Sequence, residues 1–193
     1  DEYIHFASRL ADETPEKQLE NPAFHIHGGH MPDVKDTGIS YNLLLNLASA
    51  ANAMDKDVLW GFIKRYQADL SPENAPFLDK LTEYAVNYYQ DFVKPEKTYR
   101  APTDTERQAL SDLLDRLDPL PQDSDAETIQ SEIYTIGREY YPDNQREWFK
   151  AMYETLLGQS QGPRMGSFIE LYGMDNMKDL IRQVLDGKLK AAI

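Results

Sequence analysis

Cysteine is absent from the 193 residues, so the chain has neither a disulfide framework nor a thiolate metal site. No apolar run approaches the roughly eighteen residues that cross a bilayer, and we expect no membrane partner. The chain opens on Asp1 and Glu2 instead of a basic region followed by an apolar one, so no secretory signal is visible. These absences predict a cytoplasmic location. The lack of an initiator Met predicts a fragment of a longer polypeptide.

Basic residues are scarce. The chain has 20 Lys and Arg against 33 Asp and Glu, a net charge of −13, whereas nucleic-acid-binding domains are typically basic. The charge is uneven, because residues 104–143 hold eleven acids and three bases while residues 144–193 hold six acids and seven bases. Screening limits the reach of the acidic middle to about 8 Å at physiological salt. An RNA partner is therefore expected at 144–193 or at 36–103, and DNA is not an expected partner.

Hydrophobic residues make up 41% of the chain and aromatic residues 11%, which is enough to bury a core. They recur at helical spacing, as in 40–54, 58–66 and the aromatic-rich stripe from Phe77 to Phe92. No segment of any length alternates with the period of two that is typical of a half-buried strand. The pattern predicts helices only.

Local signals predict where several helices begin and end. Asp55 is a cap for the helix after it, and 103–106 and 124–127 are capping-box patterns of the form Thr/Ser-x-x-Glu. Pro163 suits a first helical turn, while Gly158 suits the end of the preceding helix.

These elements predict an all-α fold, a helical bundle or cage of eight to ten helices joined by short turns. Residues 1–35 are broken by Pro and Gly and are expected to form a connector with one short helix. Residues 36–193 are expected to form the main domain. A division into two helical subdomains, at about 36–142 and 143–193, is left open.

Three of the four histidines lie in one short stretch, FHIHGGH. His25, His27 and His30 have the ligand types of a zinc site, but such a site needs a rigid frame and supporting partners, and this stretch is rich in Gly and Pro. The letters also resemble a nucleotide-binding HIGH signature, which works at a helix start in a βαβ fold that this sequence does not predict. We therefore expect a connector and no metal site.

Other catalytic patterns are missing. The sequence has no Gly-x-Ser-x-Gly and no P-loop, and its histidines are placed so that no Ser-His-Asp set can be named. We expect no catalytic residue and no bound cofactor in this chain.

The least ordinary stretch is YETLLGQSQGPRMGSFIELYG, residues 153–173. A polar loop, a Gly-Pro pair and a short aromatic helix are suited to an RNA loop: amides read base edges, Arg stacks or pairs, aromatic rings stack on bases, and a helix start attracts phosphate. The alternative is that the aromatic residues only pack the short helix on the bundle. The predicted RNA-binding residues here are Gln159, Gln161, Gly162, Pro163, Arg164, Met165 and Phe168.

A second predicted RNA surface is formed by Trp60, Lys64 and Arg65. Trp60 and Lys64 are four residues apart and share one face of a helix, so an aromatic ring and a cation can meet RNA together. The alternative is that Trp60 packs in the core and the two cations are ordinary surface residues. Cations at 94–100 are a further candidate for phosphate contacts.

At these residues the chain resembles a known family. LLGQSQGPRMGSFIELYG is similar to the C-terminal signature of class I lysyl-tRNA synthetases. NPAFHIHGGHMP, SYNLLLNLASAANAMDKDVLWGFIKRY and YYQDFVKPEKTYRAP resemble the segment that follows the catalytic domain in the same family. The similar stretches extend from about residue 20 to 187.

The resemblance implies an α-helix cage that binds the anticodon stem-loop of tRNA(Lys). It implies that a Rossmann-type catalytic domain elsewhere in the polypeptide uses ATP and Mg for lysine–tRNA ligation, so this chain alone would be non-catalytic. Related glutamyl enzymes carry a loop at the position of residues 161–164 that touches anticodon bases, although the residue types differ. A helical protein-interaction module without RNA binding is the alternative, and the charge of −13 favours it.

Overall fold

The structure, a computed structural model, describes residues 2–26, 28, 34 and 37–189. These residues form eleven α-helices and no strand, which confirms the all-α fold. Within the same ranges, no helix has the length and apolar character needed to cross a membrane.

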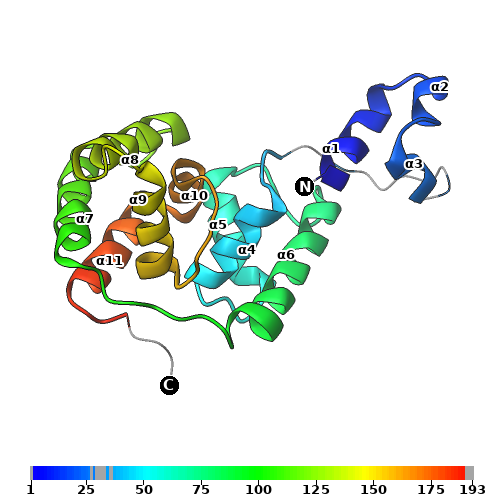
Figure 1. Ribbon diagram of the computed structural model, residues 1–193. Coiled ribbons are helices and arrows are strands. Elements are labelled where there is room, and N and C mark those ends of the chain that lie inside the picture. The colour runs from blue at the N-terminus through cyan, green and yellow to red at the C-terminus, as the bar shows by residue number, and fades with distance from the viewer. Residues whose placement is uncertain (1, 27, 29–33, 35–36, 190–193) are drawn as a thin grey trace.

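The first helices form a small unit that stands to one side of the main body (Figure 1). Its helices are α1 (Glu2–Arg9), α2 (Pro15–Gln18) and α3 (Pro22–Ile26), with a 3-10 turn at Leu10–Asp12. They share a small apolar cluster of Ala7, Leu10 and Ala23. The sequence predicts one short helix here and the structure has three. The difference arises because Pro15 and Pro22 begin helices, a position where the missing N–H costs nothing, instead of interrupting them.

Three longer helices follow, α4 (Tyr41–Ala50), α5 (Lys56–Tyr66) and α6 (Pro76–Tyr88). Asp55 accepts hydrogen bonds from the first amides of α5, which confirms it as the cap. The end of α6 widens into a π-helical turn, η2 (Tyr89–Val93).

The remaining helices are α7 (Asp104–Leu117), α8 (Ala126–Tyr140), α9 (Gln145–Met152), α10 (Met165–Tyr172) and α11 (Met174–Leu185), with a second π-helical turn, η3 (Tyr153–Leu157), after α9. The capping box of Thr103 and Glu106 is confirmed. The cap of α8 is Asp125, one residue later than the predicted Ser124, whose hydroxyl bonds instead to the carbonyl of Pro121.

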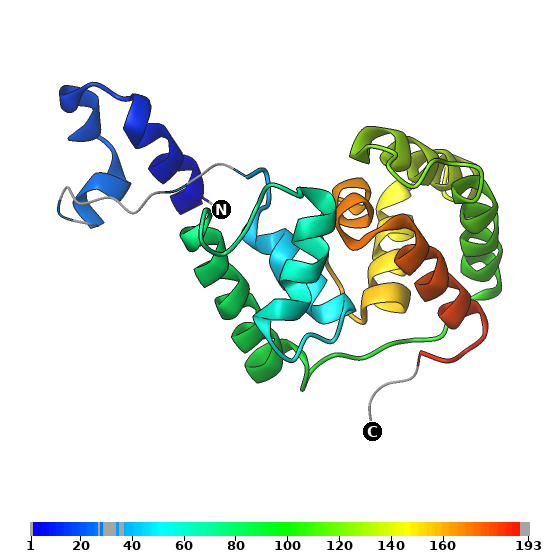
Figure 2. The ribbon, with the colours of Figure 1, turned by 180° about the vertical axis from the view of Figure 1, so that it is seen from behind.

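One apolar core runs through α4 to α11. Helix α10 packs against α8 and also against α4 and α5. It therefore lies between two groups of helices, α4–α6 and α7–α9, as both views show (Figures 1 and 2). The core is therefore continuous across residue 142, where the sequence leaves a subdomain boundary open.

The chain between η2 and α7, residues 94–103, begins with a turn at 94–96 and continues as an extended strap along one edge of the body (Figure 2). We call the whole segment the strap. The amide of Thr98 donates to the carbonyl of Gly158 across 3.2 Å. The strap is thereby fixed to the loop that follows η3, and together they border the site described next.

Candidate nucleic-acid interface

A cavity of about 780 Å³ opens between the strap, η2 and the 158–161 loop. This volume is within the range of small-molecule sites in proteins. The lining residues used below are Tyr88, Asp91, Phe92, Glu96, Lys97, Arg100, Glu154, Gly158, Gln159, Ser160 and Gln161. The cavity therefore contains two of the predicted RNA-binding residues, Gln159 and Gln161.

The 158–161 loop is built from tight local contacts. Gly158 ends η3 with φ +67°, in the left-handed region that favours glycine, and this confirms the predicted stop. The amide side chain of Gln159 donates to the hydroxyl of Ser49 across 3.0 Å. Gln161, by contrast, is exposed and makes no hydrogen bond with the described part of the chain. One amide thus anchors the loop and the other is available to a ligand.

Gly162 has an internal role. A Cβ there would lie 2.5 Å from the ring of Tyr153, and the Tyr153 hydroxyl donates to the carbonyl of Pro163 across 2.8 Å. The space above Gly162 is therefore filled by Tyr153 and leaves no room for RNA, so the predicted RNA contact of Gly162 is corrected. Pro163 is buried and shares this internal role.

The predicted phosphate site at a helix start is wrong. Helix α10 begins at Met165 and not at Pro163. The amide of Gly166 donates to the side-chain oxygen of Gln130 across 2.8 Å, and a Cβ on Gly166 would lie 2.2 Å from the carbonyl oxygen of Ala126. The first turn of α10 therefore faces α8, and the Gly166 amide is already engaged and does not offer a site for an anion.

The aromatic residues of α10 belong to the core. Met165 and Phe168 are 0% exposed, so neither is accessible to RNA and their predicted role is corrected. The Phe168 ring stacks on Tyr172 with centroids 5.3 Å apart, and Tyr172 stacks on Phe62 at 5.4 Å. The first pair lies within α10, four residues apart, and the second joins α10 to α5, which pack against each other.

Arg164 is exposed, and its guanidinium lies 2.8 Å from a carboxylate oxygen of Glu127. The two side chains are 48% and 79% exposed, and ion pairs at such positions are worth only about 0–1 kcal/mol. Arg164 therefore remains available to a phosphate.

The second predicted surface is only partly formed. Trp60 is buried, and its indole N–H donates to Asp79 across 2.9 Å, so its predicted contact with RNA is corrected. Lys64 and Arg65 are exposed, and the Arg65 guanidinium lies 4.7 Å from the centre of the Phe62 ring.

The exposed cations do not gather in one patch. Arg65 lies beside Gly173, at the C-terminal end of α10, whereas Arg164 precedes the N-terminal end. An eight-residue helix is about 12 Å long. Arg65 and Arg164 therefore lie at opposite ends of α10.

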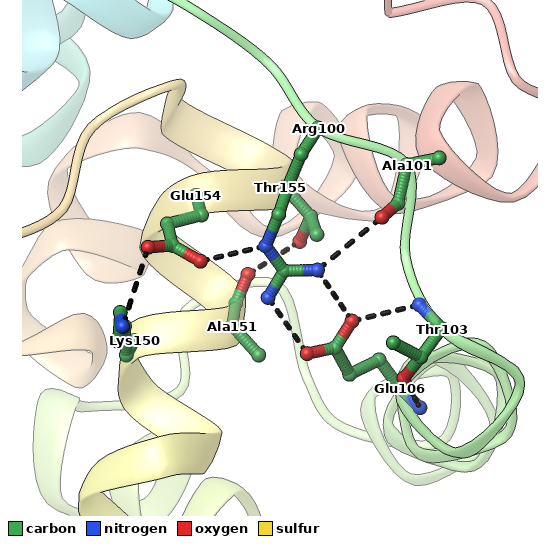
Figure 3. Close-up of polar contacts among 8 residues, drawn as sticks. All are labelled: Arg100, Ala101, Thr103, Glu106, Lys150, Ala151, Glu154 and Thr155. Atoms are coloured by element: carbon green, nitrogen blue, oxygen red, sulfur yellow. Dashed lines mark hydrogen bonds and ion pairs between the residues drawn. The ribbon is translucent and has the colours of Figure 1, made fainter.

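The strap cations are largely engaged within the protein. Figure 3 shows Arg100 between Glu106 of α7 and Glu154 of η3, at N–O distances of 2.6 and 2.7 Å to Glu106 and 2.6 Å to Glu154. The hydrogen bond from Arg100 lowers the pKa of Glu106, and the same pair raises the pKa of Arg100. Arg100 is therefore a structural cross-link and not a phosphate ligand.

Lys97 is the other engaged cation. Its ammonium group donates to the carbonyl of Ser49 across 2.6 Å and lies 5.0 Å from the centre of the Tyr99 ring. Burial lowers the pKa of Lys97 to about 8, because removal from solvent disfavours the charged amine. Of the basic residues in the strap, Lys94 is exposed and remains a candidate for RNA backbone contacts.

The sequence interpretation misses two aromatic residues at the cavity. Tyr88 and Phe92 are 46% and 61% exposed and both line it. The Phe77-to-Phe92 stripe is regular enough to predict the helix, but the packing face of α6 is the neighbouring one, with Ala85 and Val86 buried. Both faces of this helix are apolar, so periodicity alone does not select the buried one.

The histidine stretch is described only in part. His25 lies in α3, and its Nε2 is 2.7 Å from the carbonyl oxygen of Leu19. His27 and His30 lie outside the described residues. In the part of the chain that the structure covers, no three His, Asp or Glu side chains gather to hold a metal ion.

Comparison with known proteins identifies relatives over almost the entire chain. The protein named lysine–tRNA ligase of Rickettsia bellii (strain OSU 85-389) is 48% identical over 186 residues, which is 96% of this chain. Those of Rickettsia peacockii (strain Rustic) and Rickettsia conorii (strain ATCC VR-613 / Malish 7) are each 45% identical over 182 residues, or 94% of the chain. No protein-family model and no solved structure matches.

The chain spans about 36% of the length of the first of these relatives and about 35% of the other two. The resemblance of the sequence to lysine–tRNA ligases is thus confirmed. The chain is a homologue, over nearly its whole length, of part of the lysine–tRNA ligases.

Proposed function

We propose that this chain is the anticodon-binding part of a class I lysine–tRNA ligase that acts in the cytoplasm. It holds the anticodon stem-loop of tRNA(Lys), while a Rossmann-type catalytic domain of the same polypeptide joins lysine to the tRNA with ATP and Mg. The family resemblance assigns ATP and Mg to that catalytic domain. The relatives' name supports the tRNA role.

The observation that carries the proposal is the cavity beside the exposed amide of Gln161. A glutamine side chain has one acceptor and two donor hydrogens, which complement the Watson–Crick edge of uracil. Lysine codons consist mainly of adenine, so the anticodon bases that pair with them are mainly uracil. Bases of unpaired loops are read in this way, by stacking and by hydrogen bonds to their edges.

The charges around the cavity favour a base over a phosphate inside it. Asp91, Glu96 and Glu154 line it, and its two basic residues, Lys97 and Arg100, are held by internal partners. Phosphates are then expected outside, near the exposed Arg164 and Lys94. This division matches the general pattern in which phosphate contacts position a nucleic acid and base contacts specify it.

The test is binding of fluorescent anticodon stem-loops to the chain carrying Gln161→Ala. The control is Gln183→Ala, which removes an exposed amide from α11, away from the cavity. The wild-type and control proteins should bind the lysine anticodon at least fivefold more tightly than loops with one base replaced, since a wrong base costs about 1–3 kcal/mol. Gln161→Ala should remove this preference. Equal binding of all loops by the wild-type protein would contradict the proposal.

A helical protein-interaction module is the second candidate, favoured by the net charge of −13 and by the separation of Arg65 from Arg164. It predicts that the wild-type chain binds no stem-loop even at low salt, where attraction to phosphate is strongest.

A further inference from the structure

The outer face of α6 and η2 carries three exposed aromatic residues in a row. Tyr84, Tyr88 and Phe92 are 48%, 46% and 61% exposed. They are four residues apart and therefore follow one face of the helix. The buried face is a different one, formed by Leu78, Thr82, Ala85, Val86 and Tyr89. The exposed rings therefore contribute little to the core, and such a cluster of large apolar side chains marks an interaction surface.

This aromatic row leads into the cavity. Tyr88 and Phe92 both line it, together with Gln159 and Gln161 of the loop. The π-helical turn aligns the two rings: in an α-helix residues four apart are offset by roughly 40° around the axis, and the wider turn at Tyr89–Val93 reduces this offset. The Tyr88 and Phe92 ring centroids lie 5.1 Å apart with the planes tilted by 36°.

We infer that Tyr88 and Phe92, continued by Tyr84, form a stacking surface for unpaired nucleotides that guides one base into the cavity. The inference rests on the proposed function for the identity of the partner as RNA. A base inserted between two rings needs about 6.8 Å, twice the 3.4 Å separation of stacked bases. At 5.1 Å the two rings admit no base between them, so bases stack on their exposed faces.

Charge on this face favours neutral stacking over attraction to phosphate. The Lys80 ammonium group lies 5.9 Å from the centre of the Tyr84 ring, and Lys94 follows Phe92 by two residues. Glu83 and Asp91 are also exposed there, so the local charge is balanced. Because every base has an aromatic face, an aromatic surface with balanced charge, beside polar amides, suits single-stranded RNA. Binding through it should depend only weakly on salt.

The test uses the full chain with Phe92→Leu, Phe92→Trp and, as control, Tyr134→Leu. Tyr134 is an exposed aromatic residue of α8 at 42% exposure. Each protein is titrated with the lysine anticodon stem-loop and with the same hairpin carrying abasic loop nucleotides, and its thermal unfolding is compared with the wild type. Phe92→Leu should weaken binding of the intact loop at least fivefold, while Phe92→Trp and Tyr134→Leu retain it. The abasic loop should bind wild type and Phe92→Leu equally weakly.

Other outcomes overturn the inference in distinguishable ways. If the wild type discriminates anticodons and Phe92→Leu binds the intact loop as tightly, the stacking surface is wrong and the proposed function stands. If Phe92→Leu weakens the intact and abasic loops equally, or unfolds at a much lower temperature, the ring acts through the fold. If the wild type binds no loop, both proposals fail. Dimerisation of the wild type that Phe92→Leu abolishes would assign this face to a second copy of the chain.

Discussion

The side-chain amide of Gln159 donates a hydrogen bond to the hydroxyl of Ser49 across 3.0 Å. Ser49 is completely buried in the last turn of α4, and its carbonyl accepts a second bond from Lys97 of the strap. One residue of α4 therefore holds two walls of the cavity, the loop through its side chain and the strap through its backbone.

Ser49→Ala should loosen the loop and leave the strap in place, because it removes only the hydroxyl. We expect the free energy of unfolding to fall by about 1 kcal/mol, the usual contribution of one hydrogen bond, and amide exchange to accelerate at Gln159 and Ser160. Denaturant unfolding and hydrogen exchange measure the two effects. Unchanged exchange in the loop would contradict the role of this contact.

Lys97 should make the free energy of unfolding depend on pH in the alkaline range. Its pKa falls from the ordinary 10.5 to about 8 on folding. Below about pH 8 the amine is protonated in both the folded and the unfolded chain. Between about 8 and 10.5 only the unfolded chain holds the proton, so the free energy of unfolding rises with pH in this window and the gain is lost as pH falls through 8.

The comparison of wild type with Lys97→Met isolates this effect. Tyr99, whose pKa burial raises to about 12, destabilises both proteins alike above pH 10. Relative to Lys97→Met, the wild type should gain on the order of 1–2 kcal/mol between pH 8 and 10, less than the full shift because the amine is partly exposed. A stability difference that stays constant over this range would contradict the lowered pKa.

Gly162→Ala should destabilise the chain because the new methyl group meets the ring of Tyr153. Overpacking of this kind costs about 1–3 kcal/mol. Gly61→Ala is the matched control: Gly61 lies in α5 with open space around its Cβ position, so alanine there should stabilise by up to about 1 kcal/mol. Equal effects of the two substitutions on the free energy of unfolding would contradict the tight packing of Tyr153.

Glu106→Gln should break the cross-link at Arg100. Glu106 is 8% exposed, and we expect the loss of its charged hydrogen bonds to cost about 1–3 kcal/mol near pH 7. Since the folded pKa of Glu106 is lowered from 4.5, its contribution is present above pH 4.5 and is lost as pH falls through the folded value. Urea unfolding of both proteins from pH 7 downward should show the curves converging in acid. A constant separation would count against the ion pair.

Much of the fold can be predicted from short stretches of sequence. The caps at Asp55 and Thr103 and the stop at Gly158 follow from contacts within a few residues, and the structure confirms them. Pro163 is misassigned because the start of α10 is set by a distant contact, the bond from Gly166 to Gln130. Local signals carry no information about such partners.

The direction in which side chains face was harder to predict. For Phe168 and Trp60 the sequence allows either an RNA surface or the core, and both lie in the core, whereas Tyr88 and Phe92 line the cavity. An aromatic ring at helical spacing suits either position, and the packing of α10 between the two groups of helices decides which. Gln159 and Gln161 do lie together at the cavity, because neighbours in a short loop remain neighbours in space.

The central claim is that the chain reads anticodon bases, and the most direct test is the affinity of the wild-type chain for stem-loops that differ only in those bases. At low salt, replacing one base of the lysine anticodon should weaken binding by more than about 1 kcal/mol, roughly fivefold. Equal affinity for all loops, falling steeply as salt is added, would mean attraction to the RNA backbone alone and would contradict base recognition by this chain.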